Sequence, residues 1–319
     1  MDENPRAGRF LLTGSANLLT IKTVNESLAG RVEVVPLYPL SRSELVRSKI
    51  PKFISKVFRG QLPQPPESFG GNKLLEAVAT GGYPDTIKRR AERRRDDWYR
   101  AYIKSIAEPD IPEIADIANP GQIPRLLQLS ARFAGQLINL SELGRTLGID
   151  HKTVGNYLRV LKQIYLLQLV PPWSRNELSR LVKTPKLHFF DSGLLTTMRG
   201  YSAARLRSDR NLLGALLETF VFSELVKSTT WTKERVSIFH YRDKDQLEVD
   251  FVLENAGGQV VGIEVKAAAS VTRRDFAGLE RLAAAAGTAF VQGILLYDGD
   301  QTLSFGETLR AAPFPTLWA

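Results

Sequence analysis

Residues 247–266 read LEVDFVLENAGGQVVGIEVK and hold two strand patterns joined by a Gly-Gly turn. Side chains alternate between the two faces of a strand, so Glu264 and Lys266 are expected on one face and their apolar neighbours in a core. If the two strands pair as a hairpin, Asp250 lies beside them. Carboxylates grouped in this way hold a hard divalent cation such as Mg²⁺. The stretch therefore predicts a sheet with a candidate metal site suited to phosphodiester cleavage.

The C-terminal third of the sequence predicts a helix, three strands, a second helix and a strand. The first helix holds Glu218 in an otherwise apolar run, where a carboxylate costs free energy unless it is paired or bound to a metal. Glu224, farther along that helix, is expected to be solvated. Three carboxylates that converge without a cation raise the pKa of at least one of them, and a divalent ion or Lys266 would relieve this. The predicted elements are Leu212–Val226, Val236–Tyr241, Leu247–Leu253, Gln259–Lys266, Arg273–Ala286 and Phe290–Tyr297.

This order of elements, with Asp250 on the second strand and Glu264-x-Lys266 on the third, is similar to the PD-(D/E)xK nuclease superfamily. The resemblance implies a restriction-endonuclease-like αβββαβ domain in which Glu218, Asp250 and Glu264 bind Mg²⁺. It also implies that Asp250, Glu264 and Lys266 are catalytic, with Lys266 positioning the attacking water. The alternative is that Glu264 and Lys266 form a simple ion pair on a half-exposed strand. Such folds can also keep their frame and lose catalysis.

The composition narrows the class of protein. The 319 residues carry a formal net charge of +9, which is compatible with nucleic-acid binding. Cysteine is absent, which excludes disulfides and thiolate metal sites and favours a cytoplasmic protein. The three histidines, His151, His188 and His240, form no close pair, so a multi-histidine zinc site is not expected. There is no run of about 20 apolar residues, so the sequence predicts no membrane span.

Residues 141–162 predict a helix, a short turn and a second helix. Gly148 ends the first helix, and Asp150 is a good N-cap for the second. Two strands follow, at 165–170 and 186–190, with a basic loop between them, so the region predicts a winged helix-turn-helix. DNA contact and domain packing are both open as its role. The candidate DNA-binding residues are His151, Lys152, Asn156, Arg159, Arg175 and Arg180.

Two other polar features allow more than one interpretation. Residues 88–95, KRRAERRR, suit either the solvated face of a helix or a phosphate-contacting patch. Asp191 follows an apolar strand and is expected to cap the next helix, with contact to a neighbouring domain as the alternative.

Motifs spread over most of the chain resemble those of predicted AAA+-type ATPases of bacteria and archaea that end in a domain of unknown function. The resemblance implies a sensor-type polar role for Ser15 or Asn17 and makes Arg31 a candidate γ-phosphate arginine, with ATP as the nucleotide of the intact family. The matching segments are FLLTGS (10–15), LAGR (28–31), PLYPLSRSEL (36–45), GGYP (81–84), TPKLHFFDSGL (184–194), Glu218, Glu248-Val249-Asp250 and Ile263–Lys266.

The chain departs from that family at the phosphate-binding loop. It has no G-x-x-x-x-G-K-[ST] motif, so ATP hydrolysis by this chain is not expected. We therefore expect an N-terminally truncated family member. Its predicted strands at 10–15 and 32–37 would lack sheet neighbours, and their unpaired edges predict poor order or self-association.

Together these features predict a multidomain chain that mixes α/β and α structure. The expected function is a DNA-binding module with a nuclease-like domain, and DNA is the expected partner. An active Mg²⁺-dependent endonuclease and a protein-interaction platform without catalysis remain as alternatives. The expected regions are an AAA+ remnant at 1–45, a helical lid at 46–118, a winged helix-turn-helix at 119–195 and the nuclease-like domain at 196–319.

Overall fold

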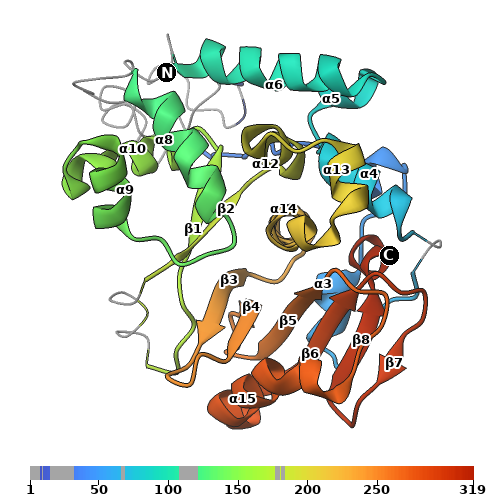
Figure 1. Ribbon diagram of the computed structural model, residues 1–319. Helices are drawn as coiled ribbons and strands as arrows, with labels where there is room; N and C mark the ends of the chain where they lie inside the picture. The colour runs from blue at the N-terminus through green and yellow to red at the C-terminus, as the bar shows by residue number, and fades with distance from the viewer. Residues whose placement is uncertain are drawn as a thin grey trace.

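The computed structural model describes residues 8, 10–14, 32–65, 69–107, 121–176, 180 and 184–319. These residues combine a six-stranded mixed sheet with a large helical part (Figure 1). Ser15, Asn17 and Arg31, the predicted nucleotide-contacting residues, lie outside them. Within the described ranges, no helix is long and apolar enough to cross a membrane.

The sheet has the strand order β3-β4-β5-β6-β8-β7. Neighbours from β3 to β5 are antiparallel, β5, β6 and β8 are parallel, and β7 pairs antiparallel with β8. The predicted order of helix, three strands, helix and strand is confirmed, whereas β7 and β8 were not predicted. The strands are β3 (Val236–Arg242), β4 (Glu248–Asn255), β5 (Val260–Lys266), β6 (Phe290–Tyr297), β7 (Leu303–Ser304) and β8 (Leu309–Pro313).

A helix packs against each face of this sheet. α14 (Gly214–Trp231) shares a core with Phe251 and Ile263, and α15 (Ala277–Ala286) packs with Val249 on the other face. α14 also contacts α4 and α12, so it is enclosed between the sheet and the helical part (Figure 1). This enclosure explains why α14 is apolar nearly all round, since a helix with neighbours on several sides has little solvent face.

The pairing of β3 with β4 contains a β-bulge at Asp250. Phe239 pairs with Val252 and Tyr241 pairs with Val249, so two residues of β4 lie opposite one residue of β3. A bulge of this kind breaks the alternation of side chains and re-aims the residue that it contains. Val249 accordingly packs on the α15 side, although Phe251, two residues on, packs on the α14 side.

Three helices and a two-stranded hairpin form a unit beside the sheet. Asn139 and Asp150 cap the second and third helices with their side chains, and Gly148 ends the second helix with a left-handed φ of 70°. Residues Ala134 and Leu137 form isolated bridges with the second strand of the hairpin. The elements are α8 (Gln122–Ser130), α9 (Leu140–Leu147), α10 (His151–Gln163), β1 (Leu167–Val170) and β2 (Lys186–Phe189).

The other helices surround α14. One hydrophobic core runs from Phe53 to Trp318 and includes side chains from the predicted lid, helix-turn-helix and nuclease-like regions. In the basic stretch, Lys88 and Arg90 are exposed, whereas Arg95 is buried and donates to the carbonyl oxygens of Arg89 and Arg90. The other helices are α2 (Arg42–Leu45), α3 (Phe53–Val57), α4 (Asn72–Thr80), α5 (Pro84–Lys88), α6 (Glu92–Ala107), α12 (Ser192–Arg199) and α13 (Ala203–Ser208). Short 3₁₀ turns in the described chain are η2 (Ala131–Phe133), η3 (Arg210–Leu213), η4 (Arg273–Phe276), η5 (Gly287–Ala289) and η6 (Phe314–Trp318).

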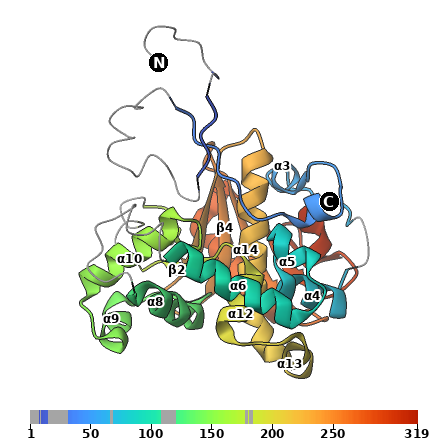
Figure 2. The same ribbon diagram turned by 90° about the horizontal axis from the view of Figure 1, so that it is seen from above.

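The two strands predicted near the N-terminus are wrong for the residues that the structure describes. Residues 10–14 and 32–37 have no strand pairing, and their large apolar side chains face solvent, with Leu11 89% and Leu37 97% exposed. Figure 2 shows both stretches projecting from the packed layers. An apolar sequence pattern becomes a strand only where a neighbouring chain offers a hydrogen-bonding ladder, which neither stretch has here.

Candidate functional site

The first candidate site is a carboxylate cluster between α14 and the sheet. Asp250 is 7% exposed, accepts a hydrogen bond from the Val265 N–H at 3.0 Å, and its charge acts on both Glu218 and Glu264. The sequence-predicted carboxylates are therefore brought together. A Cβ atom on Gly135 would lie 2.8 Å from Glu218 Oε2, so a glycine with φ of 78° is needed above this carboxylate.

Glu218 and Glu264 of this cluster have few contacts that would stabilise a negative charge. The Oε2 atoms of Glu218 and Glu264 are buried without a hydrogen-bond partner among the residues of known position. Burial raises the pKa of both carboxyls well above their usual value, and the charge of Asp250 raises it further. Burial therefore disfavours the ionised form of both groups relative to an exposed glutamate, because an ionised carboxylate without a partner is costly to bury.

Lys186 supplies the positive charge of the cluster, a role that was not predicted from the sequence. Its side chain is 3% exposed, and its ammonium lies 3.3 Å from Asp250 Oδ1 and 3.1 Å from Glu248 Oε2. Burial alone would lower the pKa of Lys186, but the charges of Asp250, Glu218 and Glu248 outweigh it and raise the pKa. Arg242 completes the group with an ion pair to Glu248 at 2.8 Å. The sequence feature that could have predicted this role is the position of Lys186, a charged residue at the start of the apolar run KLHFF (186–190).

Lys266 does not take the place that was predicted for it. Its ammonium pairs at 2.5 Å with Asp275 of η4, a residue that also accepts a hydrogen bond from the Thr272 N–H. The bulge at Asp250 explains the difference, since simple alternation along β4 and β5 no longer places Asp250 and Lys266 on one face. Lys266 therefore neutralises Asp275 rather than the carboxylate cluster.

The cluster does not present a ready metal site. Across the described ranges, no group of three or more His, Cys, Asp or Glu side chains is arranged to hold a metal ion. The carboxylate oxygens of Glu218, Asp250 and Glu264 have the chemistry that Mg²⁺ prefers. However, the Lys186 ammonium already lies against Asp250, and a cation beside it would be repelled. As arranged, these residues fit an ammonium group better than Mg²⁺.

The second candidate site is the exposed face of α10. His151, Lys152, Asn156 and Arg159 are exposed on this helix, whereas its opposite side packs in the core. Arg175 is also exposed. The first four residues lie at positions 151, 152, 156 and 159, a spacing that spreads them along one side of a helix.

Arg180 is engaged elsewhere and is not available at this face. Its guanidinium forms an ion pair with Glu254 at 2.7 Å and donates to the Ser174 carbonyl oxygen at 2.7 Å. It also lies over the rings of Phe239 and Trp173. Arg180 therefore fastens the loop before β2 to the sheet, because Glu254 belongs to β4.

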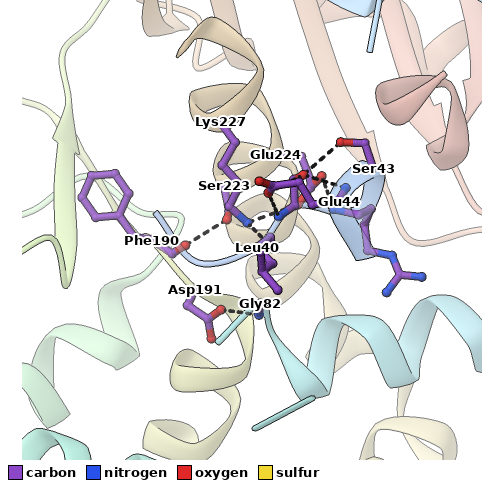
Figure 3. Close-up of polar contacts among 11 residues, drawn as sticks. Leu40, Ser43, Glu44, Gly82, Phe190, Asp191, Ser223, Glu224 and Lys227 are labelled. Carbon is purple, nitrogen blue, oxygen red and sulfur yellow. Dashed lines mark hydrogen bonds and ion pairs between the residues drawn. The ribbon is translucent and has the colours of Figure 1, made fainter. Parts of the chain in front are cut away.

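Asp191 links three segments of the helical part, and its contact with Gly82 is drawn in Figure 3. It caps α12 by accepting a hydrogen bond from the Leu194 N–H at 2.8 Å, as the sequence predicts. It also accepts from the Gly82 N–H and the Tyr99 hydroxyl, each at 2.7 Å. Both interpretations of this residue therefore hold, since one buried carboxylate caps a helix and joins neighbouring elements.

Glu224 is buried, so its predicted solvation is wrong (Figure 3). Its carboxylate pairs with Lys227 at 3.2 Å and accepts a hydrogen bond from the Arg42 N–H at 2.9 Å. Lys227 in turn donates to the Leu40 carbonyl oxygen at 3.1 Å. These contacts hold the PLSRSEL segment on α14, and they were not predictable from the helix alone because Leu40 and Arg42 are distant in sequence.

Comparisons with known proteins relate the chain to AAA-type ATPases. Residues 1–46 match the model of an AAA domain, residues 71–205 match a domain of unknown function (DUF8612), and residues 213–317 match another (DUF4143). An uncharacterized protein of Mycobacterium bovis is 26% identical over 316 residues, covering 98% of this chain and 64% of the relative. An uncharacterized protein of Methanocaldococcus jannaschii is 22% identical over 268 residues, covering 82% of this chain and 56% of the relative.

The chain thus spans less than two thirds of the length of these curated relatives. No solved structure matches it. The match to an AAA domain at residues 1–46 agrees with the ATPase resemblance inferred from FLLTGS and PLYPLSRSEL.

Proposed function

We propose that this chain is a DNA-binding module of an AAA-type ATPase-related protein, with a nuclease-like domain that does not cleave DNA. The observation that carries the proposal is the exposed face of α10. It presents His151, Lys152, Asn156 and Arg159 on a helix that follows α9 across a tight turn. Such side chains donate hydrogen bonds to phosphates and read base edges in a major groove.

The order of elements around α10 supports a winged helix. α8, α9 and α10 are followed by the antiparallel hairpin of β1 and β2, and Leu137 adds a bridge to β2. In helix-turn-helix proteins the second helix of the pair enters the groove, which corresponds to α10 here. Arg175, exposed beyond β1, adds a positive charge in the connection between the two strands.

The carboxylate cluster supports the non-catalytic part of the proposal. The frame of α14 and the strands β3 to β6 carries Glu218, Asp250 and Glu264, as a PD-(D/E)xK nuclease would. Lys186 pairs with Asp250 and Glu248, and Lys266 is held by Asp275. A site that already contains an internal cation beside Asp250 lacks the open coordination that metal-assisted hydrolysis needs. The absence of a phosphate-loop motif likewise leads us to propose that this chain alone does not hydrolyse ATP.

Salt-dependent binding to duplex DNA tests the proposal. Fluorescence anisotropy with a labelled duplex compares the wild type, Lys152→Ala/Arg159→Ala and the charge-matched control Lys73→Ala/Arg274→Ala. Lys73 and Arg274 are exposed on other elements. Each lost phosphate contact lowers the slope of log K against log salt by about 1, so the first variant is expected to lose about 2. Equal slopes and affinities for the two variants would exclude α10 as the binding face.

A plasmid assay tests the absence of cleavage. Supercoiled plasmid is incubated with the wild type in Mg²⁺ or Mn²⁺, beside Asp250→Ala and Lys266→Ala. We expect no nicking by any of the three proteins. Nicking by the wild type that disappears in Asp250→Ala would identify an active nuclease and overturn this part of the proposal. If the wild type retains no DNA at low salt, a protein-interaction platform becomes the better explanation.

A further inference from the structure

A pocket of about 490 Å³ lies beside α10, and none of the carboxylates of the first candidate site lines it. Its wall is formed by residues of α10, β1, α14 and β3, together with Tyr38 from the segment before α2. Pockets that hold small ligands typically measure about 300–1,000 Å³, so this one has the size of a ligand site.

The wall of the pocket is rich in aromatic rings. Tyr38 stacks on Phe190 with ring centroids 5.2 Å apart, and Tyr165 meets both rings edge to face. Phe222 of α14 extends this wall by packing against Phe190. Aromatic faces of this kind offer stacking surfaces to a flat ring, whatever its pattern of hydrogen-bonding groups.

Polar groups of the pocket are available to a ligand. Arg159 and Lys162 lie at the α10 side of the pocket and form no ion pair with any other described residue. Gln168 of β1 adds an amide to the wall. Burial and the neighbouring Tyr165 raise the pKa of Tyr38 to about 12, so its hydroxyl remains a hydrogen-bond donor at neutral pH.

Tyr165 adds a backbone observation at the same place. Its φ is 55°, in the left-handed region that a residue with a bulky side chain seldom adopts. Strained residues of this kind cluster at binding sites, where the surrounding structure holds them in place. The Tyr165 ring lies edge to face with Tyr38 and Phe190 in the wall of the pocket.

We propose that this pocket binds a nucleotide, with its base stacked on the aromatic wall and its phosphate held by Arg159 and Lys162. A flat ring joined to an anion is the chemistry that fits an aromatic wall beside two cations that have no ion-pair partner among the described residues. The nucleotide has two possible sources, a free mononucleotide or the unpaired end of a DNA strand. The inference goes beyond duplex recognition by α10, since the wall includes β1, α14 and β3.

Isothermal titration calorimetry with the whole chain tests the pocket. The probes are AMP, adenosine, inorganic phosphate and a 5′-phosphorylated oligo(dT). Val226→Trp places an indole in the pocket from α14, whereas Lys162→Gln removes one cation at an exposed position. We expect Lys162→Gln to weaken binding of AMP about tenfold through the lost charge-assisted contact, and to leave adenosine unchanged. Lys73→Gln, the matched exposed lysine, is expected to bind as the wild type does.

The probes distinguish the sources and the possible failures. Binding of AMP that Val226→Trp abolishes supports a free nucleotide as the ligand. Binding of the oligonucleotide alone, abolished by the same variant, supports a strand end. The proposal is overturned if neither AMP nor the oligonucleotide binds. It is also overturned if binding occurs but neither Val226→Trp nor Lys162→Gln weakens it. Duplex binding is measured in parallel, because Val226→Trp leaves His151, Lys152 and Asn156 in place and should retain it.

Discussion

The substitution Lys186→Met tests whether an internal ammonium organises the carboxylate cluster. Methionine keeps most of the side-chain length but removes the charge that lies 3.3 Å from Asp250 and 3.1 Å from Glu248. Removing one partner of a buried ion pair typically costs about 3–5 kcal/mol, because the other charge stays buried without compensation. We expect a loss of this size in the free energy of unfolding, measured by urea denaturation at neutral pH.

Lys266→Met is the matched control for this experiment. Lys266 is 30% exposed and its partner Asp275 is 23% exposed, so water screens their attraction. Partly exposed pairs of this kind contribute about 0–1 kcal/mol. The reasoning is refuted if Lys266→Met costs as much as Lys186→Met, or if Lys186→Met costs less than about 1 kcal/mol. The double variant Lys186→Met/Asp250→Asn should recover much of the loss, since it removes the orphaned charge.

The pH dependence of the Lys186→Met loss has a defined sign. Burial raises the folded-state pKa of Glu218 and Glu264 above the ordinary value of 4.5, and loss of Lys186 raises it further. A carboxyl with a raised pKa contributes stability that is complete below 4.5 and is lost as pH rises through the folded-state pKa. The difference between wild type and variant should therefore shrink as pH falls from neutral toward 4.5. A difference that grows on acidification would contradict this account.

Four further predictions concern the same cluster and the contacts around α14. Added MgCl₂ should raise the melting temperature of Lys186→Met but not that of the wild type, because only the variant lacks the ammonium that repels Mg²⁺ from these carboxylates; equal shifts would contradict this. Asp191→Asn should cost about 1.5–3 kcal/mol in urea denaturation, since the carboxylate accepts from three buried donors, whereas Asp150→Asn at an exposed N-cap should be nearly neutral. Glu224→Gln should cost about 2 kcal/mol and speed proteolysis at residues 32–50, because Lys227 loses its ion-pair partner; unchanged cleavage would show that this contact does not hold the segment. His188→Phe should stabilise the protein most at acidic pH. Burial holds the pKa of His188 well below 6.5, so the stability of the wild type falls as pH drops below 6.5, where only the unfolded chain takes up a proton. An equal effect of the substitution at all pH values would refute this.

Local patterns in the sequence were enough to predict much of the fold. The run Leu247–Lys266 predicted β4 and β5, and the caps Gly148 and Asp150 predicted where α9 ends and α10 begins. Glu218, Asp250 and Glu264 lie close enough for the charge of Asp250 to act on both glutamates, whereas their role as Mg²⁺ ligands stays a prediction.

Contacts between distant segments decided the parts that were not predicted. Lys186 reaches Asp250 across 64 residues, and the Arg42 N–H reaches Glu224 across 182 residues. Neither pairing leaves a periodic signal, since each depends on how β2 and α2 pack against other elements. The position of Lys266 was also mispredicted, because the bulge at Asp250 interrupts the alternation of side chains that would place Asp250 and Lys266 on one face. Alternation of this kind holds only in an unbroken ladder. The strands predicted near the N-terminus are absent for a different reason. Residues 10–14 and 32–37 have the apolar pattern of a strand, but they pair with no other strand among the described residues.

The position of Lys186 joins the two candidate sites through one strand. β2 pairs with β1 in the hairpin that follows α10, and its first residue places an ammonium among the carboxylates of α14 and β4. Arg180, in the connection between β1 and β2, reaches Glu254 of β4 in the same way. The hairpin and its connecting loop are therefore fixed to the six-stranded sheet by two cations, Lys186 and Arg180. Because the same ammonium both attaches the hairpin and neutralises the carboxylates, Lys186→Met should weaken the attachment as it leaves the carboxylates without their cation.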